Sequence, residues 1–196
     1  MRIGIDVDNT ILDYSRGFLT EVRMLAGLEQ TDNASKGDLK SVVTRTHGDV
    51  EWTKIQGRVY SSVPSGVEIF AGFQELLGAL IKAGHSISYM SHKSRHPIAG
   101  PPIELRKPVA DYLYANKLIS PSQSAVSLTF FETKEEKISA IVDSSFDVYI
   151  DDLPEIIESV GFTCEAIHFG CVCSPGASHL GFKDWLSIST FFAPNL

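Results

Sequence analysis

The chain has 196 residues, of which 43% are apolar and 21% are charged, as is ordinary for a globular protein with one sizeable core. Its net charge of −7, from 17 basic and 24 acidic residues, disfavours binding to nucleic acid or to a membrane surface, because both need a positive surface. No apolar run approaches the roughly 20 residues that span a bilayer, and Asp6 comes too early for a signal peptide, so we expect a cytoplasmic protein.

The first predicted element is a short buried strand at residues 2–7, where β-branched residues precede a turn-prone Asp-Asn pair. From about residue 14 to residue 63 the pattern is mainly helical, with no convincing strand. Residues 18–28 carry apolar side chains at helical spacing, and residues 31–38 (TDNASKGD) are turn formers. Residues 49–63 look helical at first, and we expect a break around Gly57.

Residues 64–196 alternate between predicted helices and strands. Helices are predicted at 69–85, 106–118, 133–145, 153–161 and 183–192, and strands at 86–91, 124–130, 146–154 and 165–170. The helix at 133–145 opens with a capping box, because Thr133 precedes Glu136 by three residues. Strands that alternate with helices of about ten residues indicate right-handed crossovers and a parallel sheet. The predicted fold class is therefore α/β.

Polar residues gather where the predicted strands end, and the carboxyl ends of parallel strands form the crevice in which ligands bind. Neighbouring strand ends supply two acids, a hydroxyl, a lysine at the start of a helix, and two more acids. In chain order these residues are Asp6 and Asp8, Ser91, Lys134 or Lys137, and Asp151 and Asp152. We expect their side chains to share one crevice.

These residue types suit phosphoryl transfer assisted by a divalent cation. Asp6, Asp8 and Asp152 can hold Mg²⁺, which prefers a few carboxylates together with water and phosphate oxygens. A carboxylate can attack phosphorus to form an aspartyl-phosphate, while the metal and a lysine offset the charge on the phosphoryl oxygens. A second acid two residues on can protonate the leaving alkoxide and later deprotonate water. Ser91 would hydrogen-bond one phosphoryl oxygen.

The motifs DVDNT, a strand-terminal Ser91, a helix-borne lysine and YIDDLPE, in this order, resemble the four motifs of the haloacid dehalogenase (HAD) superfamily. More narrowly, GRVYSSV, YMSHKSRHPIAGP, TKEEKISAI and YIDDLPEII are similar to uncharacterised HAD-like hydrolases of bacterial polysaccharide gene clusters. The resemblance covers most of the chain. It implies a Rossmann-like, three-layer core with a parallel sheet at residues 1–13 and 64–196, and a small helical cap at residues 14–63.

The resemblance also implies roles for the acids. Asp6 would be the nucleophile and Asp8 the acid/base, with the backbone carbonyl of Asp8 rather than its carboxylate facing the metal. Asp152 would be a metal ligand, and Asp151 a further ligand or a helper behind it. Dehalogenases of the superfamily lack an acid at the position of Asp8, so the resemblance points to the phosphatase branch.

Two basic parts of the predicted site allow alternative assignments. Lys134 lies at the first helical position, from which a side chain easily reaches the crevice, whereas Lys137 matches the narrower group better and is favoured as the motif lysine. The basic run after the serine is either a solvated loop or a contact for the substrate, and its candidate substrate-binding residues are His92, Lys93 and Arg95.

The leading hypothesis is an Mg²⁺-dependent phosphatase for a small phosphorylated metabolite, with neither a nucleic acid polymer nor a membrane as partner. A nucleotide 5'-phosphate is the alternative substrate class, because deoxynucleotide phosphatases share the double-acid motif. The competing hypothesis is a non-catalytic phosphate-binding or regulatory protein that retains the fold. The intact Asp6, Asp8, Ser91 and Asp152 argue against it.

The three cysteines, Cys164, Cys171 and Cys173, lie late in the chain and are odd in number. They lack the four-ligand spacing of a structural zinc site, so we expect reduced thiols rather than a metal site.

Overall fold

The structure is a computed structural model that describes residues 1–26, 34–63, 65–99, 101–120, 124–173 and 179–196. The chain divides into two units. The first contains Met1–Leu12, Ile69–Lys93 and Leu113–Leu196, and the second contains Asp13–Glu68 and Ser94–Tyr112. None of the described helices combines the length and the apolar character needed to cross a membrane.

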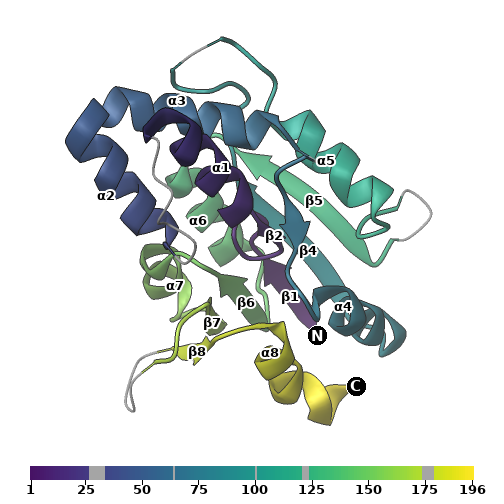
Figure 1. Ribbon diagram of the computed structural model, residues 1–196. Coiled ribbons are helices and arrows are strands. Elements are labelled where there is room, and N and C mark those ends of the chain that lie inside the picture. Colours follow the sequence, from purple (N-terminus) through teal and green to yellow (C-terminus); the bar gives the residue numbers. More distant parts are fainter. Residues whose placement is uncertain (27–33, 64, 100, 121–123, 174–178) are drawn as a thin grey trace. The chain divides into compact units, whose positions relative to one another are not determined.

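The first unit is built on a six-stranded parallel sheet. Among the described residues its strands are β1 (Arg2–Ile5), β4 (Ser86–His92), β5 (Val126–Phe131), β6 (Val148–Asp151), β7 (Glu165–Phe169) and β8 (Leu180–Phe182). Their order is β5-β4-β1-β6-β7-β8, and each neighbouring pair is parallel. Figure 1 shows β1 lying between β4 and β6. The α/β fold class with a parallel sheet is confirmed, whereas the sequence pattern did not predict β8.

Helices connect these strands, and their apolar faces supply the core. They are α4 (Phe73–Lys82), α6 (Lys134–Asp143), α7 (Pro154–Val160) and α8 (Trp185–Phe192), followed by the 3-10 turn η1 (Ala193–Asn195). The helix α5 (Arg106–Ala115) begins in the second unit and ends in the first. The predicted capping box is confirmed, because the Thr133 hydroxyl accepts a hydrogen bond from the Glu136 amide at 3.1 Å and the Glu136 carboxylate accepts one from the Thr133 amide at 3.3 Å. This cap fixes where α6 begins.

The second unit is mainly helical, with α1 (Ser15–Ala26), α2 (Lys36–His47) and α3 (Asp49–Ser61). The expected break at Gly57 is wrong, because α3 runs through it. Gly57 itself is buried, as are Trp52 and Val59, and this packed face offsets the weak helix propensity of glycine. Trp52 stacks on Phe18 with ring centroids 5.2 Å apart, so the second unit has its own aromatic core.

The two short strands β2 (Leu12–Asp13) and β3 (Glu68–Ile69) pair with each other as a separate sheet. The second unit begins and ends within these strands rather than at residues 14 and 63, and it also includes Ser94–Tyr112, which the sequence analysis assigned to the core. One cause is a hydrogen bond of 3.2 Å from the Tyr112 hydroxyl to the Val67 carbonyl, which ties the later segment to the end of the insertion.

Candidate active site

Two neighbouring strands bring Asp6 and Asp151 together. Ile5 pairs with Ile150 in the register of β1 and β6, and the Asp6 amide then donates to the Ile150 carbonyl at 2.8 Å. Ile3 and Ile5 are fully buried, so packing of β1 carries the next residue into the interior, where Asp6 is only 5% exposed. The carboxyl ends of the two strands therefore place two acids side by side, as predicted for a parallel sheet.

Lys137 lies between these two acids. It follows the Thr133 cap by one turn of α6, and its Nζ lies 2.5 Å from Asp6 Oδ1 and 2.7 Å from Asp151 Oδ2. The side chain of Lys137 is 1% exposed. A lysine is almost never buried to this degree unless carboxylates pair with it. The two acids therefore account for the burial of Lys137.

Asp151 is held by further donors that the sequence analysis missed. The Tyr149 hydroxyl donates to Asp151 Oδ2 at 3.0 Å, and the Leu153 amide donates to Oδ1 at 2.9 Å. Tyr149 and Asp151 are two residues apart on β6 and so share a face of the sheet, which is the signal that could have predicted the contact. By contrast, no hydrogen bond to Asp6 Oδ2 is found among the described residues, which leaves this oxygen for a ligand or a reaction.

Burial raises the pKa of Asp6 well above its usual value. Lys137 opposes that rise, and the neighbouring carboxylates of Asp151, Asp152 and Asp8 add to it. For Lys137, burial lowers the pKa, but the carboxylates of Asp6 and Asp151 outweigh burial and the net shift is upward. A buried carboxylate among other acids is stabilised in its charged form by an additional cation.

Asp6, Asp151 and Asp152 form a carboxylate cluster in which one oxygen of each residue lies within 4.8 Å of the others. Asp6 and Asp151 share the single ammonium of Lys137, and Asp152 adds a third carboxylate beside them. Hard oxygen donors are the ligands that Mg²⁺ prefers. The cluster therefore fits a divalent cation, with Asp6 and Asp152 as the main ligands because both oxygens of Asp151 already accept hydrogen bonds.

The carboxylate of Asp8 is not part of this cluster. Its Oδ1 lies 2.9 Å from Nζ of Lys93, and its Oδ2 accepts a hydrogen bond from Ser91 Oγ at 3.2 Å. Ser91 is fully buried at the end of β4, and the side chain of Lys93 is 4% exposed. The two residues expected to contact the substrate thus fix the orientation of the expected acid/base.

A tight turn begins directly after Asp8. Asn9 adopts a left-handed conformation, with φ of 64°, and its amide donates to the Leu12 carbonyl at 2.8 Å. Asparagine tolerates this conformation better than most residues, which accounts for the Asp-Asn pair in the sequence. The chain therefore turns away from the sheet immediately after Asp8.

The remaining predicted site residues lie elsewhere. The ammonium of Lys134 pairs with the carboxylate of Glu155 on α7, and the Lys134 side chain is 40% exposed, so Lys137 is the lysine that contacts Asp6. His92 is the last residue of β4, and burial lowers its pKa. Arg95 belongs to the second unit, where its Nε lies 3.6 Å from Glu104 Oε2.

The parallel sheet with acids at the ends of β1 and β6 defines a Rossmann-like α/β fold of the kind found in HAD-superfamily hydrolases. Among solved structures, the chain is similar to a HAD-superfamily hydrolase from Ehrlichia chaffeensis (16% identity, TM-score 0.57, 99% of this chain and 96% of that one). It is also similar to a subfamily IA HAD hydrolase from Geobacter sulfurreducens (11% identity, TM-score 0.58, 97% and 95% covered). A protein from Clostridium acetobutylicum described as a predicted phosphatase has 15% identity and a TM-score of 0.63, with 98% and 96% covered.

By sequence alone, no protein-family model matches the chain and no curated protein is significantly similar to it. At 11–16% identity the likeness to solved structures establishes the fold, and it confirms the fold that the motif resemblance implied. The narrower resemblance to hydrolases of polysaccharide gene clusters stays a prediction.

Proposed function

We propose that the protein is a phosphatase that hydrolyses a small phosphorylated metabolite through an aspartyl-phosphate on Asp6, with Mg²⁺ as cofactor. The observation that carries the proposal is the buried contact of Lys137 with Asp6 and Asp151 beside the carboxylate of Asp152. A structural role alone would not require two acids and one lysine in the interior, because a buried ion pair contributes little net stability.

In this proposal Asp6 Oδ2 attacks the phosphorus atom of the substrate. Lys137 holds Asp6 Oδ1, so the carboxylate is oriented before the substrate arrives and the attacking oxygen has little freedom to turn away. The same ammonium offsets negative charge as the phosphoryl group approaches the carboxylate. Asp151, fixed by Tyr149 and the Leu153 amide, holds Lys137 in place.

Asp8 supplies the proton for the leaving alkoxide and takes a proton from the water that hydrolyses the phospho-Asp6 ester. Ser91 and Lys93 hold its carboxyl group on both oxygens before the substrate binds, and Lys93 keeps Oδ1 in place during both steps. Lys93 also brings a second positive charge close to the acid. Ser91 would turn its hydroxyl from Asp8 to a phosphoryl oxygen when the substrate is bound.

Asp6 and Asp152 would hold the Mg²⁺, with Asp151 behind them. When bound, the cation supplies charge neutralisation for the phosphoryl oxygens. The formal charges of the site agree with this role. Asp6 and Asp151 share one ammonium, that of Lys137, and Asp152 adds a further carboxylate beside them, an arrangement that a divalent cation would stabilise.

The test is phosphate release from a panel of phosphorylated sugars and nucleotide 5'-phosphates, with Mg²⁺ and with a chelator. We expect turnover of at least one compound with Mg²⁺ only, and its chemical class decides between the two substrate classes. Asp6→Asn should abolish turnover. Binding of phosphate compounds without turnover in the wild-type protein would refute the proposal and favour the non-catalytic alternative.

Asp143→Asn is a matched control, because Asp143 is an exposed aspartate at the far end of α6 and the same change should leave turnover unaltered. A second measurement separates the chemistry from a general loss of folding. Rapid acid quenching with a ³²P-labelled substrate should leave label on the wild-type protein and none on Asp6→Asn. Equal labelling of both proteins would exclude Asp6 as the nucleophile.

A further inference from the structure

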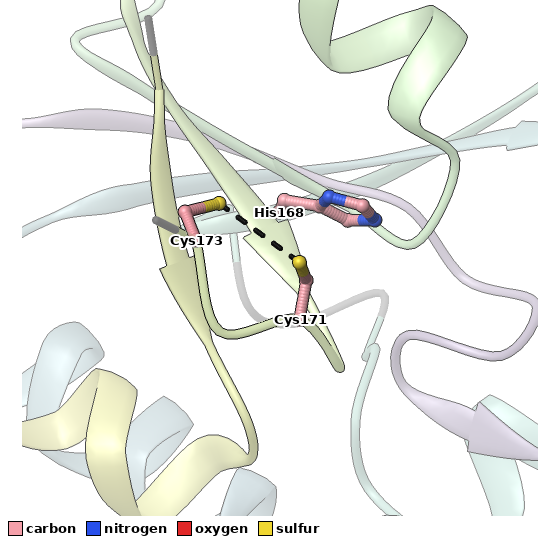
Figure 2. A group of neighbouring side chains, drawn as sticks. All are labelled: His168, Cys171 and Cys173. Carbon is pink, nitrogen blue, oxygen red and sulfur yellow. Dashed lines mark hydrogen bonds between the residues drawn. The ribbon is translucent and has the colours of Figure 1, made fainter. Parts of the chain in front are cut away.

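A second cluster of potential metal ligands lies on β7 and the segment that follows it. One ligand atom each of His168, Cys171 and Cys173 lies within 4.8 Å of the others, and all three side chains are half-buried. Figure 2 shows the two sulfur atoms facing each other with the imidazole ring beside them. These three residues, here called the His–Cys–Cys cluster, are separate from the carboxylate cluster and take no part in the proposed hydrolysis.

The chain is folded locally to bring the two thiols back beside β7. Gly170 has a φ of 77°, a conformation that favours glycine, and its amide donates to the Phe182 carbonyl of β8 at 2.8 Å. Opposite the cysteines stands Gly181, where a Cβ would lie 2.5 Å from Cys173 Sγ and 2.7 Å from the Cys173 amide nitrogen. The absence of a side chain at Gly181 therefore makes room for the cysteine segment.

The separation of the two thiols matches that of a tetrahedral metal site. Cys171 Sγ lies 3.9 Å from Cys173 Sγ, too far for a disulfide, and both cysteines are free thiols. Two thiolates bound to one zinc ion at about 2.3 Å with a tetrahedral angle would be about 3.8 Å apart. The pair is thus arranged for a shared ion without further movement of the chain.

His168 is oriented as a metal ligand would be. Its Nε2 lies 3.1 Å from the backbone carbonyl of Asp152, and because a carbonyl only accepts, Nε2 carries the proton. In the neutral ring the lone pair is then on Nδ1, which is free to bind a metal. Histidine ligands commonly donate their other N–H to a carbonyl or carboxylate, which fixes both the tautomer and the ring.

A second histidine borders the cluster. The ring of His179 lies 5.7 Å from that of His168, centroid to centroid, and Nδ1 of His179 is buried without a hydrogen-bond partner among the described residues. A buried ring nitrogen without a partner is costly, and binding to a metal would satisfy it. His179 is outside the 4.8 Å set, so its ring must turn to reach an ion held by the other three residues.

We propose that the protein binds one zinc ion at the His–Cys–Cys cluster, with His168 Nδ1 and the thiolates of Cys171 and Cys173 as ligands and His179 in the fourth position. Soft sulfur donors and imidazole select zinc over Mg²⁺, so the two clusters take different ions. Two thiolates balance the charge of Zn²⁺, and binding releases one proton from each thiol. The site would be structural, tying the segment after β7 to the strand ends of β6 and β7.

The experiment measures zinc bound to the full chain after dialysis against trace zinc, by elemental analysis. We expect one zinc per wild-type chain and its loss, at least about 100-fold in affinity, in Cys171→Ser/Cys173→Ser. Two variants should retain it. Cys164→Ala removes the third thiol, and Asp152→Asn alters the carboxylate cluster but keeps the carbonyl that faces His168. Zinc retained by the double serine variant, or lost in Asp152→Asn, would overturn the proposal.

Two readouts on the wild-type chain do not depend on how the variants fold. Zinc should protect two of the three thiols from a thiol reagent, and a chelator should expose them. Cobalt(II) in place of zinc should give the near-ultraviolet absorption of a cobalt–thiolate bond, which carboxylate ligands cannot produce. Three reactive thiols with zinc bound, or no such absorption, would exclude the site. None of these readouts uses phosphatase activity.

The fourth ligand has its own variant. His179→Gln should lower the affinity for zinc by about 10-fold or more while the protection of both thiols persists at saturating zinc. An unchanged affinity would overturn the assignment of His179 to the fourth position.

Discussion

Replacing Lys137 by methionine tests the buried contact on which the candidate active site depends. Methionine has nearly the same length but no charge, so Lys137→Met leaves the carboxylates of Asp6 and Asp151 buried without their cation. The side chains of Lys137, Asp6 and Asp151 are 1%, 7% and 0% exposed, so solvent screens their interaction very little. Removing one partner of such a buried pair destabilises a protein by about 3–5 kcal/mol. The free energy of unfolding should fall by that amount.

Lys134→Met is the matched control, because it is the same substitution one turn earlier on α6. Lys134 pairs with Glu155, but these side chains are 40% and 52% exposed, and exposed pairs contribute about 0–1 kcal/mol. Urea unfolding of both variants, in a chelator at neutral pH, gives the comparison. Losses within about 1 kcal/mol of each other would refute the assignment of Lys137 as the buried partner of both acids.

A double variant separates the loss of the charge pair from a simple loss of packing. Asp6→Asn/Lys137→Met removes one of the two carboxylates that the single variant leaves unpaired, while Asp151 keeps Tyr149 and the Leu153 amide. It should therefore be more stable than Lys137→Met alone by more than about 1 kcal/mol. Additive losses from Asp6→Asn and Lys137→Met would contradict this coupling.

Three further predictions concern pH, packing and a helix cap. Activity should fall as pH drops through the raised pKa of Asp6, and because Mg²⁺ favours the ionised carboxylate, the acid limb of kcat/KM should move to lower pH as Mg²⁺ increases. Gly181→Ala should destabilise the protein by about 1–3 kcal/mol in urea and weaken zinc binding, because the new Cβ would overlap Cys173, whereas Gly78→Ala has open space. Thr133→Ala should lower stability by about 1 kcal/mol in the same assay, since it removes the cap of α6.

Local patterns predicted the frame of the candidate site well. Alternation of apolar runs and turn formers gave the parallel strands, and the Thr133–Glu136 capping box gave the start of α6. Local patterns could not decide whether Lys134 or Lys137 contacts Asp6, because both lysines lie near the start of α6. Burial decides it, since Lys134 faces Glu155 on α7 and Lys137 lies against the sheet beside Asp6.

Contacts between residues far apart in the chain were not predictable from spacing. The pairing of Lys93 with Asp8 joins residues 85 positions apart, and in the sequence Lys93 is only one member of a basic run. The grouping of Ser94–Tyr112 with the insertion depends in the same way on the contact of Tyr112 with Val67. Local periodicity carries no information about such partners, so the pattern of this segment resembles that of the core.

The proposed zinc site shows a different limit of sequence patterns. Known structural zinc sites have a four-ligand spacing, whereas HFGCVC supplies a histidine and then two cysteines at the third and fifth positions after it. A histidine near the end of a strand indicates a metal ligand only when its other ring nitrogen has a hydrogen-bond partner. For His168 this partner is the Asp152 carbonyl. That contact joins β7 to the end of β6. It depends on the register of these two strands, which the sequence pattern does not give.

The end of β6 therefore takes part in both clusters. Asp151 directs its side chain to Lys137, whereas Asp152 contributes its carboxylate to the carboxylate cluster and its backbone carbonyl to His168. A parallel sheet makes this possible, because adjacent strand ends carry groups of different chemistry within a few ångströms of each other. The acids there are costly to bury and contribute little to stability by themselves. Their presence at the ends of β1 and β6 agrees with the proposed hard cation, whereas the proposed soft cation would be held by sulfur and nitrogen at and beyond the end of β7.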